Sequence, residues 1–353
     1  MKVAVIGAGL GGLCLAQGLR EAGIDVEVFE RDPGVHARFQ GYRIGLADIG
    51  RDALLACLPA RLHPLLDAVT GTLSGRRVFF DTQLRQLREL PPMTATAVDR
   101  HVLRHVLLDG VDVHFGKEFT GYRGTRAEFA DGTHVDADLI VGADGIASAV
   151  RAQLAPDIRP TDTGVRCVIG RTTLTREYEM LVPGFGSGVS DGKVQLMLGL
   201  MRFRRPPREA GRELGVDLPD TPDYVRWVLL PAPEAPGKAV EGWHPRVRAL
   251  VEATDPAHSA WLSISVVRPE RRWSPGRVTL LGDAIHATSP SGGNGANAAL
   301  HDARLLRDLL VQRDVPEAVE EYETQMLAYG AEAVDHSVAM LDQFLPGRAG
   351  RRS

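Results

Sequence analysis

The hydrophobic positions near the N-terminus follow two periods in turn. Residues 3–6 form a short apolar run rich in β-branched side chains, as in a buried parallel strand. From Leu13 to Ala22 the apolar residues recur at helical spacing, Gly23 suits a helix C-terminus, and a second apolar run ends at Glu30. This order predicts a strand, a helix and a second strand, which is the βαβ unit of a parallel sheet.

The same alternation of helix and strand returns later in the chain. Residues 96–109 predict an amphipathic helix with Asp99 as its N-cap, and residues 139–141 predict another buried strand. From residue 277 the chain continues with a buried strand, a glycine-rich turn and a long helical region to about residue 345. We therefore expect one parallel layer to be assembled from segments that are far apart in the sequence.

Two other segments have a different pattern. Around residues 71–90 and 157–272, polar and apolar residues alternate at period two, in the later segment between loops rich in Pro and Gly. This alternation predicts an antiparallel sheet with one covered face, and Pro91 and Pro92 are expected to end the first segment. The fold class predicted is α/β: a Rossmann-type domain with an inserted antiparallel β-sheet, the candidate substrate domain, and C-terminal helices.

Composition and charge exclude several classes of function. The formal net charge of −4 gives no electrostatic reason to expect nucleic acid or an anionic membrane as a partner. No stretch approaches the roughly 20 apolar residues of a membrane span, and the N-terminal run reads as mature fold because it carries a glycine motif. The 3 cysteines are odd in number and far apart, which argues against disulfides or a zinc site and favours the cytoplasm.

A glycine motif stands where the first strand should turn into the helix. Gly7, Gly9 and Gly12 form G-x-G-x-x-G, and Glu30 ends the second strand. The first glycine permits a tight turn, the second lets the backbone approach a pyrophosphate, and the third lets the helix pack closely on the strand. Glu30 can accept hydrogen bonds from a ribose diol, so the motif predicts bound FAD or NAD rather than NADP.

Two strands further along also end in acidic turns. The stretch D-L-I-V-G-A-D-G runs from Asp138 to Gly145, and L-L-G-D-A-I-H begins at Leu280. The second stretch continues into P-S-G-G-N-G-A-N, from Pro290 to Asn297. Ligands of open α/β sheets bind at the carboxyl ends of the strands, so both turns are candidates for the same site as the glycine motif.

The three motifs together resemble the class A flavoprotein monooxygenases, the p-hydroxybenzoate hydroxylase-like family. The resemblance covers residues of about 1–60, 95–155 and 272–345 and leaves the middle of the chain uncovered. It implies a discontinuous FAD-binding domain of residues 1–70, 93–156 and 272–345. Residues 71–92 and 157–271 would form the substrate-binding domain, and residues 346–353 a tail.

The resemblance also implies which residues meet the cofactor. Asp144 and Gly145 match a motif associated with the pyrophosphate and with NAD(P)H use, Asp283 matches the aspartate that binds the ribitol chain, and Pro290 to Asn297 match the segment beside the isoalloxazine. No catalytic side chain is identified, and Arg43 and Pro290 are candidates. The complete set implied for FAD is Gly7, Gly9, Gly12, Glu30, Arg31, Arg38, Arg100, Asp144, Gly145, Asp283, Pro290, Gly293, Gly295, Ala296 and Asn297.

The function implied is an FAD-dependent, NAD(P)H-consuming monooxygenase of secondary metabolism. It would hydroxylate or epoxidise a small aromatic or polyketide-like substrate through a flavin C4a-hydroperoxide, with O₂ and transiently bound NADPH or NADH as co-substrates and no metal. We expect a monomer or homodimer. Two alternatives stay open from the sequence: a flavin-dependent reductase or dehydrogenase, and a non-redox cyclase or binding protein that contains FAD.

Overall fold

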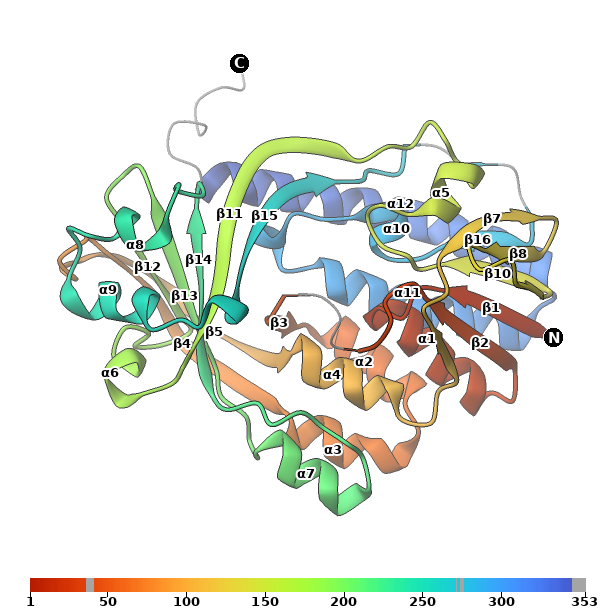
Figure 1. Cartoon of the computed structure of the whole chain (residues 1–353), viewed down its shortest axis with the longest axis horizontal. Helices are drawn as coiled ribbons and strands as arrows, with labels where there is room; N and C mark the ends of the chain where they lie inside the picture. The colour runs from red at the N-terminus through yellow and green to blue at the C-terminus, as the bar shows by residue number, and fades with distance from the viewer. Residues whose placement is uncertain (36–40, 271, 274–275, 345–353) are drawn as a thin grey trace.

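Two large sheets make up most of the fold in the computed structural model, which describes residues 1–35, 41–270, 272–273 and 276–344 (Figure 1). In the first sheet every neighbouring pair of strands runs parallel. The order of its strands is β16 (Val278–Leu280), β10 (Leu139–Gly142), β1 (Lys2–Ile6), β2 (Asp25–Glu30) and β6 (Val113–Phe115). The predicted parallel layer, built from distant segments, is confirmed.

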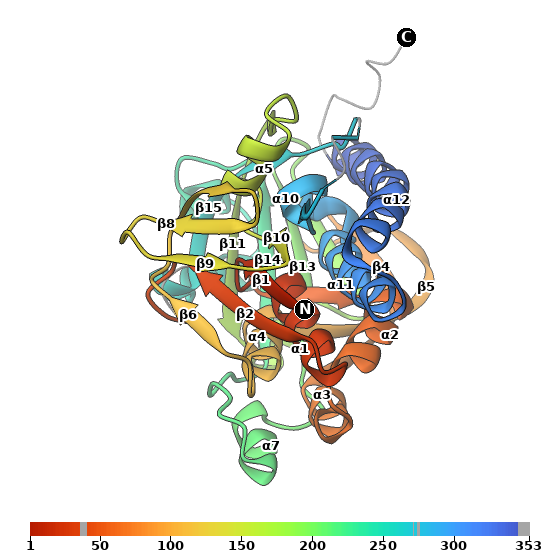
Figure 2. The same cartoon turned by 90° about the vertical axis from the view of Figure 1, so that its right-hand side faces the viewer.

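Helices and a small sheet cover the two faces of this layer. Figure 2 shows α11 (Gly295–Gln312) and α12 (Val315–Phe344) on one side, and the three-stranded sheet on the other. The helix α1 (Leu10–Glu21) joins β1 to β2, packs on α11, and is followed by Gly23 in the left-handed region, as expected. The small antiparallel sheet contains β7 (Phe119–Arg123), β8 (Arg126–Phe129) and β9 (His134–Asp136).

The second large sheet has eight strands and is antiparallel except where β4 runs parallel to β12. That exception lies where the early segment of the chain meets the middle segment. Figure 1 shows the helices α6, α8 and α9 on its outer side. Its order is β15 (Ser259–Val266), β11 (Thr161–Thr173), β14 (Tyr224–Leu230), β13 (Gln195–Met201), β12 (Gly186–Ser190), β4 (Thr70–Phe80), β5 (Gln86–Asp99) and β3 (Arg43–Leu46).

Shorter helices connect the layers or cover their edges. The α-helices are α2 (Asp48–Cys57), α3 (His63–Ala68), α4 (Arg100–Leu108), α5 (Ala149–Leu154), α6 (Arg176–Glu179), α7 (Pro207–Leu214), α8 (Pro236–Ala239), α9 (Pro245–Glu252) and α10 (Asp283–His286). The 3-10 turns are η1 (Ala60–Leu62), η2 (Pro256–His258) and η3 (Pro290–Gly292). Together with the two sheets they confirm the predicted α/β fold class.

The prediction that Pro91 and Pro92 end the first alternating segment is wrong, because β5 continues through both to Asp99. The partner strand β4 has an irregularity between Gly75 and Arg77 opposite this point. The other neighbour, β3, pairs with β5 only over residues 96–99. Proline is tolerated at a bulge and on an unpaired edge because no ladder hydrogen bond is lost there. The strand ends at Asp99, whose side chain caps α4 as predicted.

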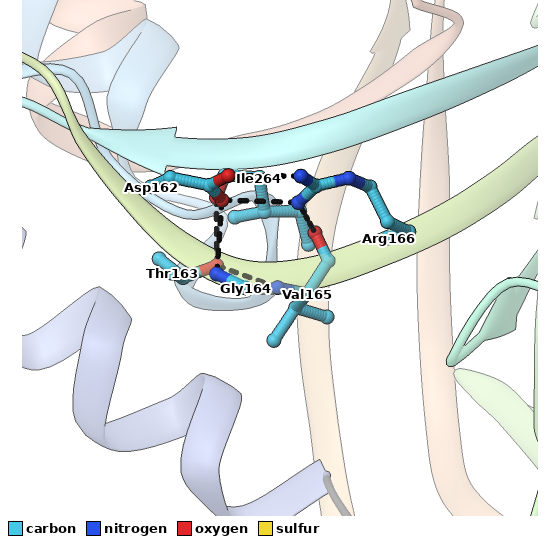
Figure 3. Close-up of polar contacts among 6 residues, drawn as sticks. All are labelled: Asp162, Thr163, Gly164, Val165, Arg166 and Ile264. Carbon is cyan, nitrogen blue, oxygen red and sulfur yellow. Dashed lines mark hydrogen bonds and ion pairs between the residues drawn. The ribbon is translucent and has the colours of Figure 1, made fainter.

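The strand β11 carries a second irregularity that lets it bend toward the parallel layer. Its pairing with β15 shifts between Asp162 and Val165, and Gly164 has a φ of +72°. Figure 3 shows how polar contacts brace this bulge: both guanidinium NH groups of Arg166 donate to the Asp162 carboxylate, at 3.0 and 2.8 Å. Thr163 donates to the carbonyl of Ile264 across the strands at 2.6 Å. The bulge bends the strand while its pairing with β15 continues on both sides of it.

The outer face of the second sheet has a core of its own, centred on Trp227. This indole packs with apolar residues of β13, β14 and α9, separately from the main core. It lies over Gly170, where a Cβ atom would be 2.2 Å from the ring, and its NH donates to Thr254 at 2.9 Å. The inner face of the same sheet joins the main core, which it shares with the parallel layer. In the described residues, no helix is long and apolar enough to cross a membrane.

A buried carboxylate on α12 makes the stability of the fold depend on pH. The side chain of Glu323 is fully buried, and its Oε1 accepts hydrogen bonds from Trp273 and Thr279 at 2.9 and 2.8 Å. Its Oε2 has no partner within the described residues. Burial raises the pKa of Glu323 from 4.5 to about 7. Because the folded state holds this proton more tightly than the unfolded state, the stabilisation is complete at low pH and is lost as pH rises toward 7.

We predict that Glu323→Gln stabilises the protein at about pH 8 and has little effect at about pH 5. The amide keeps the acceptor for Trp273 and Thr279 and removes the buried charge. The expected gain in the free energy of unfolding above pH 7 is roughly 1–3 kcal/mol, to be measured by urea unfolding at both pH values. The exposed Glu332 on the same helix supplies the control variant Glu332→Gln. An equal effect of Glu323→Gln at both pH values would contradict the prediction.

Candidate functional site

The turn between β1 and α1 brings backbone segments into direct contact. A Cβ atom on Gly7 would lie 2.3 Å from the carbonyl oxygen of Ala143, and one on Gly12 would lie 2.3 Å from the carbonyl oxygen of Gly7. The tight turn and the close helix packing expected of these two glycines are therefore present. Gly9 differs, because a Cβ atom there would meet nothing within 4 Å and its backbone is extended. Packing does not require glycine at this position, so open space remains before the N-terminus of α1.

Glu30 lies at the end of β2, next to this turn, and is almost completely buried. Its carboxylate accepts hydrogen bonds from the backbone NH of Ala8 at 2.9 Å and of Asp32 at 3.0 Å. The buried guanidinium of Arg104 donates to the carbonyl of Ala8 at 2.9 Å and lies 3.8 Å from the Glu30 carboxylate. Arg104 therefore holds the turn and the acidic residue together. No motif in the sequence singles it out, although it lies four positions after Arg100, in the stretch R-H-V-L-R.

The three other arginines expected near the cofactor have different positions. Arg31 follows β2 directly and is exposed. Arg38 lies outside the described residues. Arg100 begins α4, is partly buried, and its backbone NH donates to the carbonyl of Tyr42 at 2.9 Å. This bond joins the start of α4 to the segment that leads into β3.

The second motif forms the turn after β10. Asp144 accepts hydrogen bonds from the NH groups of Ala149 and Val150, at 2.7 and 3.2 Å, so its carboxylate faces the N-terminus of α5. Burial raises its pKa, and its Oδ1 has no partner within the described residues. Gly145 adopts a φ of +79°, and a Cβ atom there would meet nothing within 4 Å.

The buried Arg151 ties this turn to the third motif. Its guanidinium donates to the carbonyl of Ile146 at 2.7 Å and to the carbonyl of Ala284 at 2.6 Å. Ala284 directly follows Asp283, the first residue of α10. The two acidic turns are therefore held side by side by one side chain, at the carboxyl ends of neighbouring strands.

A buried pair of side chains supports the turn that carries Asp283. His286 and Asp302 are both fully buried, with 2.7 Å between the His286 Nε2 and a carboxylate oxygen. The same carboxylate accepts hydrogen bonds from the NH of Gly282 at 2.7 Å and from Tyr329. Burial opposes the charged imidazolium, but the Asp302 carboxylate outweighs it, so the pKa of His286 is raised. His286 is thus packed inside the protein, where it supports the turn that carries Asp283.

The segment from Pro290 to Asn297 leads into the N-terminus of α11. Pro290 and Gly293 are exposed, and Gly295 and Ala296 begin the helix. A Cβ atom on Gly295 would lie 2.6 Å from the Thr288 hydroxyl and 3.7 Å from the Asp283 carboxylate. The first hydrogen bond at this end runs from Ala298 to Asn294. The preceding three NH groups therefore have no partner within the helix, and the end carries a partial positive charge.

The side chain of Asn297 contacts the protein rather than open space. Its oxygen accepts from the NH of Ala47 at 2.9 Å, and its NH₂ group donates to the carbonyl of Gly45 at 3.0 Å. These bonds hold the start of α11 against β3 at the edge of the second sheet. The backbone NH of Asn297 lies at the N-terminus of α11 with those of Gly295 and Ala296.

The second sheet closes the other side of this region. Tyr224 on β14 donates a hydrogen bond from its hydroxyl to the Asp99 carboxylate at 2.7 Å, where α4 begins. Arg43 on β3 donates to the carbonyl of Leu200 at 3.0 Å, so its guanidinium lies over β13. Of the two candidate catalytic residues, Arg43 is therefore on the second sheet and Pro290 is on the exposed approach to α11.

The residues present fit a bound dinucleotide. Gly9 and Gly145 leave open space after the neighbouring strands β1 and β10, and Gly293 does so before α11, because a Cβ atom at each would meet nothing within 4 Å. The N-termini of α1 and α11 supply unpaired NH groups, which favour anionic phosphate or reduced-ring charge. In the described residues, no group of three or more His, Cys, Asp or Glu side chains could hold a metal ion.

Comparisons with known proteins agree with this geometry. The FAD binding domain family matches residues 1–177 and 245–342. The dual O-methyltransferase/FAD-dependent monooxygenase CTB3 of Cercospora beticola is 32% identical over 92% of this chain, but the match covers 44% of that protein. The chain thus spans less than half the length of this fungal relative. The 3-amino-4-hydroxybenzoate 2-monooxygenase of Streptomyces cremeus is 31% identical, over 98% of this chain and 88% of that enzyme.

Solved structures show the same fold. A crystal structure from Photorhabdus luminescens, described as that of an FAD containing monooxygenase, superposes with a TM-score of 0.81 at 29% identity and covers 97% of both chains. HpxO of Klebsiella pneumoniae, solved with FAD and uric acid, shares the fold with a TM-score of 0.76 at 24% identity, over 99% of this chain and 89% of that one. The family match covers all three motifs. The chain therefore belongs to the FAD binding domain family of p-hydroxybenzoate hydroxylase-like, class A flavoprotein monooxygenases.

Proposed function

We propose that this protein is a monooxygenase that uses FAD, NADPH or NADH, and O₂ to hydroxylate or epoxidise a small aromatic or polyketide-like molecule. The observation that carries the proposal is the meeting of three motif turns and the N-terminus of α11 at one edge of the parallel sheet, opposite the inner face of the second sheet. We further propose the division into an FAD-binding domain and a substrate-binding domain along that boundary. The 3 cysteines are free and buried, which supports a cytoplasmic location.

The roles proposed for individual residues follow from their positions. The open space at Gly9 and the N-terminus of α1 would receive the pyrophosphate, and Glu30 would accept from the adenosine ribose. Asp283 would bind the ribitol chain, and the NH groups of Gly295 and Ala296 would stabilise negative charge on the reduced ring. When bound, FAD would accept electrons from the nicotinamide and would then activate O₂.

Positioning residues would keep these groups in place. Arg104 fixes the turn around Ala8 and Glu30, and Arg151 fixes the two acidic turns relative to one another. Such preorganised groups need no rearrangement when charge develops, which is how a protein contributes to reactions carried out by a cofactor. The second sheet would supply the walls of the substrate site and exclude water. The names of relatives that act on aromatic compounds support this assignment.

We predict that the oxidised flavin bleaches when NADPH or NADH is added without oxygen. With oxygen-18 gas, a converted probe should then gain one labelled oxygen atom, measured by mass spectrometry. Suitable probes are 3-amino-4-hydroxybenzoate and urate, which two relatives are named for. Bleaching with hydrogen peroxide as the only product of every probe would favour a reductase or dehydrogenase. A flavin that stays oxidised with both nicotinamides would favour the non-redox alternative.

We predict that Gly9→Ala weakens FAD binding at least about tenfold, or about 1.4 kcal/mol, without destabilising the apoprotein. The backbone at Gly9 suits alanine, and its Cβ atom would meet no protein atom within 4 Å, so only a ligand can meet it. FAD affinity is measured by titrating apoprotein and following the flavin fluorescence.

Two variants control this experiment. Gly237→Ala on α8 also adds a Cβ atom with nothing within 4 Å, on the far side of the second sheet, and should leave FAD affinity unchanged. Gly12→Ala should destabilise the apoprotein itself, because its Cβ atom would lie 2.3 Å from the Gly7 carbonyl oxygen. Unchanged FAD affinity in Gly9→Ala would show that the pyrophosphate does not lie at this turn.

A further inference from the structure

Four arginines lie close together at the second sheet, and we refer to Arg43, Arg77, Arg171 and Arg226 as the arginine cluster. Arg171 on β11 is directly opposite Arg226 on β14, which in turn is directly opposite Gly199 on β13. Residues directly opposite one another in neighbouring strands project from the same face of a sheet. The pairing therefore places Arg171 and Arg226 side by side on one face, next to a position without a side chain.

This face is the one that looks toward the parallel layer. Along β14, Trp227 belongs to the separate outer core, whereas Tyr224 and Val228 belong to the main core shared with the parallel layer. Side chains alternate between the two faces of a strand, so Arg226 projects on the same side as Tyr224 and Val228. The Tyr224 hydroxyl reaches Asp99 at the start of α4, which confirms the direction.

Arg43 reaches the same place from the other edge of the curled sheet. Its guanidinium lies over Gly199, where a Cβ atom would be 2.8 Å from one of its nitrogens, and it donates to the carbonyl of Leu200 at 3.0 Å. Any larger residue at Gly199 would displace this guanidinium. Arg77 on β4 adds a further cation, with its guanidinium 5.4 Å from the centre of the Phe185 ring.

Within the described residues, the guanidinium groups of this cluster form no ion pair. The Nε atoms of Arg43 and Arg226 are both shielded from solvent and have no hydrogen-bond partner in the described part of the chain. Arg171 contacts the Nε2 of His258 at 3.1 Å and the face of Tyr42 at 5.0 Å, neither of which is a carboxylate. Among the described residues, none of the four guanidinium groups is within 4.0 Å of a carboxylate oxygen. Burial lowers the pKa of Arg43 to about 10, and the neighbouring Arg226 adds to this effect.

Several cations that are partly shielded from solvent and have no ion pair in the described chain are costly in free energy, and an anionic ligand would reduce the cost. The guanidinium group is a planar fork of donors that matches the two oxygens of a carboxylate or of a delocalised enolate. The groups around the cluster include aromatic and apolar side chains. Tyr42 and Tyr224 meet edge to face with 6.0 Å between ring centres, and Met197 lies on the same face as Val228. Such surroundings favour a flat, conjugated ligand.

We propose that the arginine cluster is the anion-binding part of the substrate site, and that the substrate is a planar conjugated anion whose carboxylate or ionised enol is held by Arg226 and Arg43. That the bound anion is a substrate rests on the proposed function. Binding of the anion can be measured without turnover. Arg226 would be a specificity-determining residue, because its Nε is shielded from solvent and has no hydrogen-bond partner in the described chain.

The test is calorimetric titration of the FAD-loaded protein with matched anionic and neutral probes. The carboxylate arm compares 2-naphthoate with 2-naphthamide, and the enolate arm compares 2-hydroxy-1,4-naphthoquinone, ionised at neutral pH, with its 2-methoxy ether. We expect at least one anion to bind about tenfold or more tightly than its neutral partner, and the arm that shows this identifies the anionic group. Equal or weaker binding of the anion in both arms, including no binding at all, would overturn the proposal.

Variants of Arg226 separate charge from shape. Arg226→Gln should abolish the preference for the anion, and Arg226→Lys should restore part of it, because it returns the charge without the fork. Arg248→Gln, on α9 at the outer side of the same sheet, is the matched control and should retain the full preference. A preference that survives in Arg226→Gln would overturn the assignment of this residue.

A measurement without any ligand gives an independent check. Removing one uncompensated cation should raise the melting temperature of the FAD-loaded protein by about 2 °C or more in Arg226→Met, in a buffer without small carboxylates. A lowered melting temperature would mean that Arg226 is already stabilised within the protein, against the proposal.

Anion preference without oxygen transfer would retain this inference and reject the monooxygenase. Oxygen transfer without anion preference would retain the monooxygenase and reject the anion-binding role of the arginine cluster.

Discussion

The close contact between α1 and β1 is the constraint on which the rest of the site depends. With 2.3 Å between a Cβ atom on Gly12 and the carbonyl oxygen of Gly7, only glycine lets the helix begin so near the strand. The same turn touches the loop after β10 through Gly7 and Ala143. The N-terminus of α1 is therefore held at the carboxyl edge of the sheet, where the turns after β10 and β16 also end. Once this packing is set, the three motifs must share one location.

Most polar side chains of the site bind the protein itself. Arg104 and Arg151 each bridge two loops through backbone carbonyls, and Asn297 joins α11 to β3. Buried polar groups of this kind are stable only when they are fully paired, and their pairing makes the loops rigid. The open positions are instead Gly9, Gly145 and Gly293, where a Cβ atom would meet nothing within 4 Å. The site is thus a rigid frame of paired polar groups around positions left free for a ligand.

The two sides of the site differ in charge. On the parallel layer, Glu30 and Asp144 accept backbone hydrogen bonds at helix or strand ends. On the second sheet, the arginine cluster gathers cations that have no carboxylate oxygen within 4.0 Å in the described part of the chain. The net charge of −4 for the whole chain does not reveal this separation of charges. Because electrostatic interactions weaken with distance and in solvent, it is this local arrangement, rather than the total charge, that selects ligands.

The sequence by itself determined the parts of the molecule that depend on local order. The βαβ unit, the glycine turn, the Asp99 cap and the alternation of the second sheet are all properties of neighbouring residues, and the structure contains each of them. Tertiary structure alone decided which distant residues meet. Pro91 and Pro92 stay within β5 because a bulge lies opposite them, and Asn297 binds β3 because the edge of that strand lies beside α11. Arg43, Arg77, Arg171 and Arg226 are scattered over 184 positions (226 − 43 + 1) and share no motif. Their proximity follows from strand register and from the curl of the sheet, and no spacing along the chain encodes it.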